Sequence, residues 1–524
     1  MDYLKKEKIN FKKNALIKGT LILTIAGFIT RLIGFFYRIF LSNNLGAEKL
    51  GIYQLIFPVY GICFTIYATG IQTSISRLVA RAAANYDKKK IHSILKTGVT
   101  LSFLIAIFLS FVIYSYSDYI SWRLLLEPRS SSSIKLLVIV FPFCSITSCI
   151  NGYYYGLKKA GVPASTQLLE QIIRVITVYM ASIVLGGADQ KITCELAVLG
   201  IVIGEVFSSI YNITSLFFIT PEILHLDKSN KNTQRKNQNS ILVEILKLSI
   251  PLSSNRLLIN ILSSIEAVLI PSMLKRTGLT TKEALSIFGV LNGMSIPFIL
   301  FPSTIANSFA VMLLPMISEA QASYNDRLIS LTTSLTMKYS IIIGILSTGV
   351  FILFGKDLGS LIFNNNLSGD FLVILAWLCP FLYLTTTLSS IINGLGKTYI
   401  TFINSIVGVI IRIGFIILMV PKYGIKGYLF GLLTSQLIIS FLDIYNANKF
   451  IKITFNAYDW ILKPSILITI EGFFIFKLYN YLSLNTQVNQ LILLLFAAVI
   501  LTTSYIFSLL IFKSITIDEI RKTK

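Results

Sequence analysis

The stretch ALIKGTLILTIAGFITRLIGFFYRIFLS, residues 15–42, shows two features that recur along the whole chain. It is apolar over more than the roughly 20 residues that an α-helix needs to cross a bilayer, and it keeps two arginines inside the apolar run. Six lysines within residues 5–18 resemble the start of a signal peptide. The run continues to Ile39 without a small-residue cleavage pattern, so we expect an uncleaved first membrane helix.

The composition of the chain favours a bilayer over water as its solvent. Of 524 residues, 54% are hydrophobic and 13% are charged, whereas soluble domains carry roughly a quarter charged residues. Lysine and arginine number 46 against 24 acidic residues, which gives a net charge of +22. In a soluble protein that excess would suggest nucleic acid, but most of these residues lie between apolar runs, as the positive-inside rule requires. We therefore expect no nucleic-acid partner.

About fourteen segments have the length and hydropathy of membrane-spanning helices, which predicts an all-α polytopic membrane protein. They lie near 15–42, 49–80, 91–117, 133–157, 163–186, 192–220, 243–274, 283–317, 328–355, 371–394, 398–420, 425–448, 458–482 and 488–512. Basic residues follow the second, fourth and sixth segments and lie at both ends of the chain. By the positive-inside rule, both termini are therefore predicted to be cytoplasmic.

The chain matches itself when it is shifted by about 238 residues. Residues 79–87 then align with 317–325, and residues 156–174 align with 394–412. Both matches fall at the same point of a six-helix count, which indicates a duplication. Because six is even, both copies enter the membrane from the same side, so the two six-helix repeats are parallel.

The duplication divides the chain into four predicted regions. We expect a lobe of six helices in 1–226, a polar cytoplasmic linker in 227–240 and a second six-helix lobe in 241–450. Two extra helices and a tail follow in 451–524. Two similar bundles that face each other leave a central cavity, which is the geometry of alternating access.

Charged residues inside the apolar segments are the first candidates for a functional site, because a charge at the bilayer centre costs at least about 2.5 kcal/mol on insertion scales. Arg31 lies midway along the first segment, and Arg38 follows seven residues later on the same helix face. For Arg31 the alternatives are a cavity-facing role and a structural ion pair. For Arg38 they are the cavity and a guanidinium that reaches the outer interface.

The fifth segment carries Glu170, Gln171 and Arg174. Glu170 and Arg174 are four residues apart and can pair on one helix face, either as a polar cavity wall or as a neutral pair that lets the helix insert. Three more cavity candidates follow in later segments: Arg256, Glu266 and Arg412. Glu205 and Asp443 are further buried acids, either of which can simply pair with a neighbouring helix.

Several kinds of chemistry are disfavoured by the sequence. The five cysteines form no CxxC pair and are expected to be small buried hydrophobes, and with only two histidines no metal cluster is expected. Gly396-Lys397-Thr398 resembles the end of a phosphate-binding loop, but the motif needs a glycine where Ile391 stands. No long extramembrane segment holds paired carboxylates or a nucleophile with a base, so we expect neither an enzyme nor a cofactor.

The order and spacing of four short motifs resemble the stage V sporulation protein B family. They are TRLIGF at 30–35, LGA at 45–47, LGIY at 50–53 and EQIIR at 170–174. That family belongs to the polysaccharide-exporter branch of the multidrug/oligosaccharidyl-lipid/polysaccharide (MOP) flippases. The resemblance implies a bacterial cytoplasmic membrane protein of fourteen helices with two lobes.

A weaker resemblance to the MurJ-type lipid II flippases implies the role of particular residues. That family has a cationic central cavity and a groove for the lipid tail formed by its last two helices. The resemblance maps a cavity arginine onto Arg31, with Arg38 replacing a second one beside Tyr37. Where that family has an Arg and a Glu in its eighth helix, this chain has Asn292 and Ser295, and a second-helix arginine is also missing, so we expect a less cationic cavity.

Three functions remain open from the sequence. The first is a flippase that moves an undecaprenyl-pyrophosphate-linked saccharide, such as a peptidoglycan precursor for the spore cortex, and that is coupled to membrane potential, H+ or Na+. The second is a cation-coupled exporter of drugs or of another oligosaccharide-lipid from the same superfamily. The third is a scaffold for cell-wall synthesis proteins without transport. The expected partners are the lipid-linked glycan and membrane lipids, and a monomer is favoured.

Overall fold

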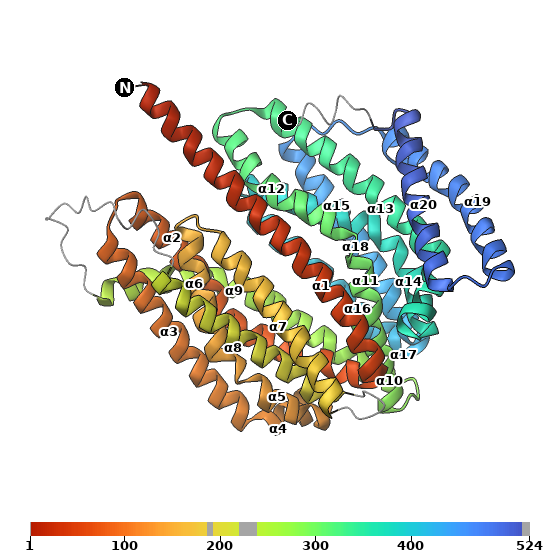
Figure 1. Cartoon of the computed structure of the whole chain (residues 1–524), viewed down its shortest axis with the longest axis horizontal. Helices are drawn as coiled ribbons and strands as arrows, with labels where there is room; N and C mark the ends of the chain where they lie inside the picture. The colour runs from red at the N-terminus through yellow and green to blue at the C-terminus, as the bar shows by residue number, and fades with distance from the viewer. Residues whose placement is uncertain (1, 186–191, 219–237, 516–524) are drawn as a thin grey trace. The chain divides into compact units, whose positions relative to one another are not determined.

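The chain is described by a computed structural model that covers residues 2–185, 192–218 and 238–515 (Figure 1). The predicted linker lies outside these residues except for its last three, which begin a helix. Within the described part of the chain all regular structure is helical. The all-α prediction is therefore confirmed.

The described residues form twenty α-helices. In chain order they are α1 (Asp2–Phe64), α2 (Gly70–Ala84), α3 (Lys88–Ser115), α4 (Ser117–Tyr119), α5 (Ser131–Leu137), α6 (Val140–Gly156), α7 (Gly161–Leu185), α8 (Cys194–Phe218), α9 (Gln238–Lys275), α10 (Thr281–Gly289), α11 (Ile296–Leu300), α12 (Ser303–Ala322), α13 (Asp326–Phe363), α14 (Asn366–Leu375), α15 (Cys379–Gly394), α16 (Thr398–Leu418), α17 (Val420–Tyr423), α18 (Ile425–Phe450), α19 (Lys463–Asn485) and α20 (Gln490–Ile511).

Eleven helices among the described residues are long and apolar enough to cross a membrane, or twelve if the bent pair of 128–137 and α6 forms one span. Residues 22–84 count once in that number, although α1 is interrupted at Gly46, where φ is 75° and ψ is 165°. All fourteen predicted segments overlap helices. The membrane class is confirmed, while the number fourteen stays a prediction.

The chain divides into two compact units. The first comprises residues 1–37 and 52–268, and the second comprises 38–51 and 269–524. In this division most of α9 groups with the helices before it, because its residues pack against α2 and α3. The four predicted regions stay predictions.

Each unit has its own apolar core. In the first unit Ile75, Val79, Ile94, Tyr154 and Ile245 bring α2, α3, α6 and α9 together (Figure 1). In the second unit a cluster joins α12, α13, α15 and the end of α18. These cores hold each helix bundle together by packing, which is the main force between helices in a lipid environment.

The outward faces of the helices are apolar as well. On α3, the large side chains of Leu104, Phe108 and Phe111 are all more than half exposed. A soluble monomer rarely exposes an apolar patch of such extent, whereas lipid tails solvate it. All five cysteines are buried, as expected for small apolar residues.

The local structure at both matched turns recurs after 238 residues. Tyr86 and Tyr324 have φ of 56° and 54°, and the residue after each donates its backbone N–H to a carbonyl five residues earlier. At the other match Lys158 and Gly396 have φ of 59° and 76°. Equal hydrogen-bond patterns at equal positions support the duplication, although the complete six-helix repeat stays a prediction.

Candidate functional site

Two glycines on α8 let this helix approach α7 closely. A Cβ on Gly204 would lie 2.9 Å from the carbonyl oxygen of Glu170, and one on Gly200 would lie 3.3 Å from that of Arg174. Glycines four residues apart permit such contact between membrane helices because no side chain separates the backbones. The spacing places Glu205, the next residue, beside the charged face of α7.

Glu170 and Arg174 form the ion pair that their spacing predicted, with Glu170 Oε1 as the acceptor. The hydroxyls of Tyr37, Tyr53 and Tyr60 lie within electrostatic range of the guanidinium. The pair is partly exposed, so it lies at the edge of the bundle rather than in its sealed interior. Since its charges cancel, the pair is tolerated at this depth in the membrane.

The first helix contacts this face of α7. Gln171 is buried, and its Nε2 would lie 3.4 Å from a Cβ on Gly34 of α1. Arg31 lies three residues before Gly34, close to one helical turn, and is exposed. The structure thus brings α1 beside Glu170, Gln171 and Arg174 within the first unit.

The other predicted site residues are distributed differently. Arg256 is exposed on α9, whereas Glu266 on the same helix is buried. Arg38 and Arg412 belong to the second unit, where Arg38 is exposed and the Arg412 side chain lies back along α16 toward Gly408. Arg256 and Glu266 belong to the first unit, as α7 and α8 do.

Asn260 is a polar contact that sequence reasoning did not single out. It donates to the carbonyl oxygen of Gly61 at 3.1 Å and to the hydroxyl of Thr65 at 2.6 Å. Thr65 begins η1 (Thr65–Thr69), a π-helical turn that follows Pro58 by two helical turns. An asparagine inside an apolar segment was the available signal, because irregular membrane backbone needs partners for its carbonyls.

Asn292 and Ser295 lie in a second π-helical turn, η6 (Val290–Ser295). The Ser295 hydroxyl is within 3.2 Å of the hydroxyl and the carbonyl oxygen of Ser368, and Asn292 donates to its own helix at Phe288. Both side chains therefore satisfy local backbone or side-chain groups in the second unit.

Asp443 forms a separate polar cluster in the second unit. Its carboxylate accepts from Asn404 Nδ2 at 2.7 Å and from the Ser389 hydroxyl at 3.3 Å. It is fully buried and has a donor on each oxygen. Pairing with neighbouring helices, one of the alternatives from the sequence, is what the structure shows for this residue.

Among the described residues no group of three acidic, cysteine or histidine side chains could hold a metal ion.

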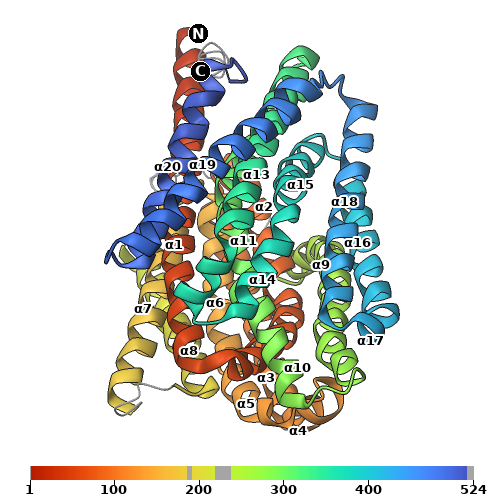
Figure 2. The ribbon, with the colours of Figure 1, turned by 90° about the vertical axis from the view of Figure 1, so that its right-hand side faces the viewer.

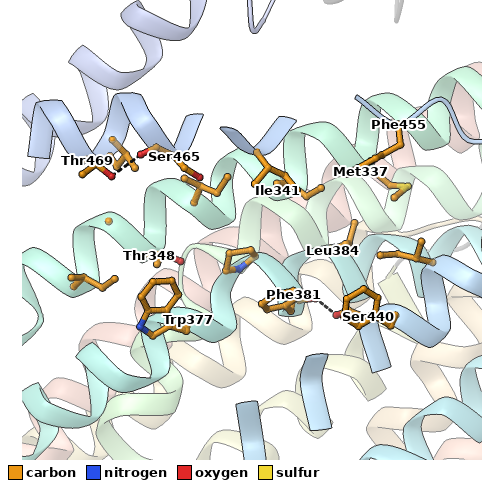
Figure 3. A pocket seen from close by; sticks show the side chains of 18 of the residues that line it. Met337, Ile341, Thr348, Trp377, Phe381, Leu384, Ser440, Phe455, Ser465 and Thr469 are labelled. Carbon is orange, nitrogen blue, oxygen red and sulfur yellow. Dashed lines mark hydrogen bonds between the residues drawn. The ribbon is translucent and has the colours of Figure 1, made fainter. Parts of the chain in front are cut away.

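The second unit also contains an apolar pocket of about 900 Å³ (Figure 3). Its walls come mainly from α13, α15, α18 and α19. Phe381 and Trp377, which lies in the 3-10 turn η7 (Ala376–Leu378) before α15, are on one side, and Ser465 and Thr469 are on the other. Three of its polar groups are hydrogen-bonded to backbone: the Ser440 hydroxyl donates to the carbonyl oxygen of Phe381 at 2.9 Å, Thr348 to that of Ala376 at 2.9 Å and Thr469 to that of Ser465 at 2.7 Å. A pocket of this volume is at the large end for small-molecule sites and suits an apolar ligand.

The last two helices contribute unequally to this pocket. Figure 2 shows α19 and α20 as a pair beside α13, and both contact that helix. Residues of α19 line the pocket, whereas α20 packs behind them and supplies none of the lining residues that the structure describes.

A family model described as polysaccharide biosynthesis protein matches residues 16–321, more than half of the chain. The chain belongs to this family. Stage V sporulation protein B of Bacillus subtilis (strain 168) is 24% identical over 516 residues, which cover 97% of this chain and 98% of that protein. The resemblance to stage V sporulation protein B, which the short motifs indicated, is therefore confirmed over nearly the whole chain.

Two solved structures share the fold of this family member. The lipid II flippase MurJ in an inward closed conformation superposes with a TM-score of 0.66 at 15% identity, covering 94% of this chain and 98% of that one. An inward-facing multidrug resistance MATE family transporter of the MOP superfamily gives a TM-score of 0.64 at 16% identity, covering 80% and 94%. The chain is thus a multi-pass membrane protein with the MOP superfamily fold.

Proposed function

We propose that this protein is a flippase that moves an undecaprenyl-pyrophosphate-linked saccharide, such as a peptidoglycan precursor of the lipid II type, from the inner to the outer leaflet. The observation that carries the proposal is the apolar pocket of about 900 Å³ formed by α13, α15, α18 and α19. A free sugar has no need of such a pocket, whereas a polyprenyl tail must remain in apolar surroundings while its headgroup crosses the membrane.

Arg31 is the proposed contact for the pyrophosphate. Its planar guanidinium suits phosphate oxygens, and the low dielectric of a membrane interior strengthens such a contact. The position beside α7 adds the partly exposed Arg174 as a further donor nearby, and the buried Gln171 contacts α1 one helical turn from Arg31. Support also comes from the similarity to the lipid II flippase MurJ.

The proposed cycle is alternating access without an enzymatic step or a bound cofactor. Membrane potential, H+ or Na+ would supply the driving force, and both termini would lie in the cytoplasm of a bacterial cell. A monomer surrounded by membrane lipids is sufficient for this cycle, and cell-wall synthesis proteins would use the product. The spore cortex is the proposed destination of the product, and the similarity to stage V sporulation protein B supports a role in sporulation.

Reconstitution of the full chain into lipid vesicles tests the proposal. Lipid II with a fluorescent headgroup is placed in both leaflets, and an impermeant quencher reports the labels that reach the outer leaflet. We expect loss of the protected fraction with the protein and not with empty vesicles. A protected fraction that is unaffected by active, correctly folded protein contradicts the proposal.

A cation-coupled drug exporter is the second candidate function. It is favoured by a specific observation, the buried acidic side chains of Glu205 and Glu266, because an acidic cavity attracts cationic drugs. The MATE-like fold is consistent with it. Uptake of a cationic dye into the same vesicles distinguishes the two functions, since a lipid flippase leaves the dye distribution unchanged.

A further inference from the structure

Glu205 is a buried carboxylate with an oxygen that has no partner. Only 5% of the residue is exposed, and Oε1 accepts no hydrogen bond from the described residues. Glu205 is the twelfth of the 25 residues of α8, so it lies near the middle of a membrane-spanning helix. Buried polar atoms are nearly always paired, so a carboxyl oxygen without a protein partner at this depth is suited to carry a proton.

The charges that face Glu205 come from α7. They are Glu170 and Arg174, which are paired with each other. With Glu205 ionised, two carboxylates and one guanidinium leave the cluster with one uncompensated negative charge. With Glu205 protonated, the cluster is neutral.

The remaining neighbours of Glu205 are uncharged. Cys144 and Thr147 face the carboxyl from α6, and Tyr60 and Tyr67 face it from α1 and η1. The hydroxyl oxygens of Thr147 and Tyr67 are buried, and neither makes a hydrogen bond of full strict geometry among the described residues. Thr147 lies close enough to the Glu205 carboxyl to interact with it. Hydroxyls can donate to a carboxylate or accept from a carboxylic acid, so they can serve both states of Glu205.

We propose that Glu205 is a proton-binding site, which takes up H+ as the neutral acid in one state of the transport cycle and releases it as the carboxylate in another. The bound proton comes from water on one side of the membrane and returns to water on the other, and no other bond changes. The partly exposed Glu170 and Arg174 mark the open edge of the cluster. The coupling of this site to lipid movement rests on the proposed flippase function.

The proton site is tested first without transport. Infrared difference spectra of the reconstituted full chain are recorded between about pH 5 and about pH 9, above the ordinary range of exposed carboxyls. We expect the carbonyl stretch of a protonated carboxyl in the wild type and its loss in Glu205→Gln. The matched control is Glu127→Gln, because Glu127 is equally buried but already paired with Arg129 at 2.6 Å; its spectrum should keep the band. Glu205→Asp changes the same position but keeps a carboxyl, so it should retain the band. This variant separates the loss of the carboxyl from poor folding of Glu205→Gln.

A band that is unchanged in Glu205→Gln overturns the proposal. The titration is repeated with sodium replacing choline at constant ionic strength. A band that disappears as sodium is added, at a pH where it is otherwise present, identifies Na+ as the natural ligand and also overturns it.

Coupling is tested by lipid flipping with the membrane potential clamped and a proton gradient imposed. We expect the gradient to change the flipping rate of the wild type several-fold, whereas the rate of Glu205→Gln, whatever its absolute value, should not depend on the gradient. A glutamine variant that responds to the gradient as the wild type does overturns coupling through Glu205. If the wild type does not flip lipid at all, the proposed function fails, whereas the infrared result still decides whether Glu205 binds a proton.

Discussion

Gly204 on α8 lies directly against the main-chain carbonyl of Glu170 on α7, where an added Cβ would be 2.9 Å from the oxygen. The contact is with backbone rather than with a flexible side chain, so a larger residue cannot be accommodated by a rotamer change. This contact sets the distance between the two helices and therefore the position of Glu205 relative to the Glu170–Arg174 pair.

Replacing Gly204 by alanine is expected to destabilise the protein by about 1–3 kcal/mol, the usual effect of adding a methyl group to a packed contact. The measurement is the unfolding midpoint of the purified protein in detergent. The control is Gly414→Ala on α16, where no atom lies within 4 Å of the added Cβ. Equal midpoints for the two variants would show that α7 and α8 separate without cost.

Removing the guanidinium of Arg31 is expected to lower flipping of lipid II. Hydrogen bonds to charged groups contribute about 1.5–3 kcal/mol, which corresponds to roughly a 10- to 100-fold loss of affinity in Arg31→Ala. Arg31→Lys should retain part of the activity because it keeps the charge but not the planar fork. The control is Arg276→Ala, an exposed residue just after the end of α9. Flipping by Arg31→Ala at the wild-type rate and equal protein content excludes Arg31 as a phosphate ligand.

Phe441 and Phe430 provide a matched pair on α18. Both side chains are 60% exposed, but only Phe441 lines the apolar pocket. We expect Phe441→Ala to weaken binding of the lipid tail by about 1 kcal/mol, or roughly fivefold, because apolar contact is lost. Phe430→Ala should bind as the wild type does. Binding is measured with a polyprenyl phosphate in detergent, and equal affinities for both variants would place the tail elsewhere.

The Asn260–Thr65 contact predicts an energetic coupling between α9 and the π-helical turn. Asn260→Ala and Thr65→Ala are each expected to destabilise the protein, and together by less than the sum of the two. The coupling energy should be about 0.6 kcal/mol and at most about 2, as found for hydrogen bonds between membrane helices. Unfolding midpoints of the four proteins of the cycle give this quantity. Strict additivity would mean that the 2.6 Å contact contributes nothing.

The membrane class and the positions of the helices could be predicted because they depend on contiguous residues. A run of about 20 apolar residues is sufficient to define a spanning helix, and each predicted segment overlaps one. The Glu170–Arg174 pair was also predictable, since four residues bring two side chains to one helix face. The turns at Tyr86 and Tyr324 repeat because equal local sequences form equal local hydrogen bonds.

The partners of Glu205 and Asn260 could not be predicted in the same way. Their contacts come from helices that are remote in sequence, and the hydropathy of a segment does not specify which face meets which neighbour. The apolar pocket is a similar case, because α13, α15, α18 and α19 are far apart in the sequence and nothing in one of them alone indicates a space between them.

By itself, the sequence determined that this protein lies in a membrane, where its helices are and that Glu170 can pair with Arg174. These features depend on hydrophobicity and helical spacing within one or two dozen neighbouring residues. Only the tertiary structure decided that Gly204 brings Glu205 beside Glu170, with hydroxyls from other helices around it. The physical reason is that close packing depends on the shapes of two surfaces at once. In the sequence, Gly204 is only a small residue. Its role in packing is defined by the backbone of α7, which lies against it in the folded protein.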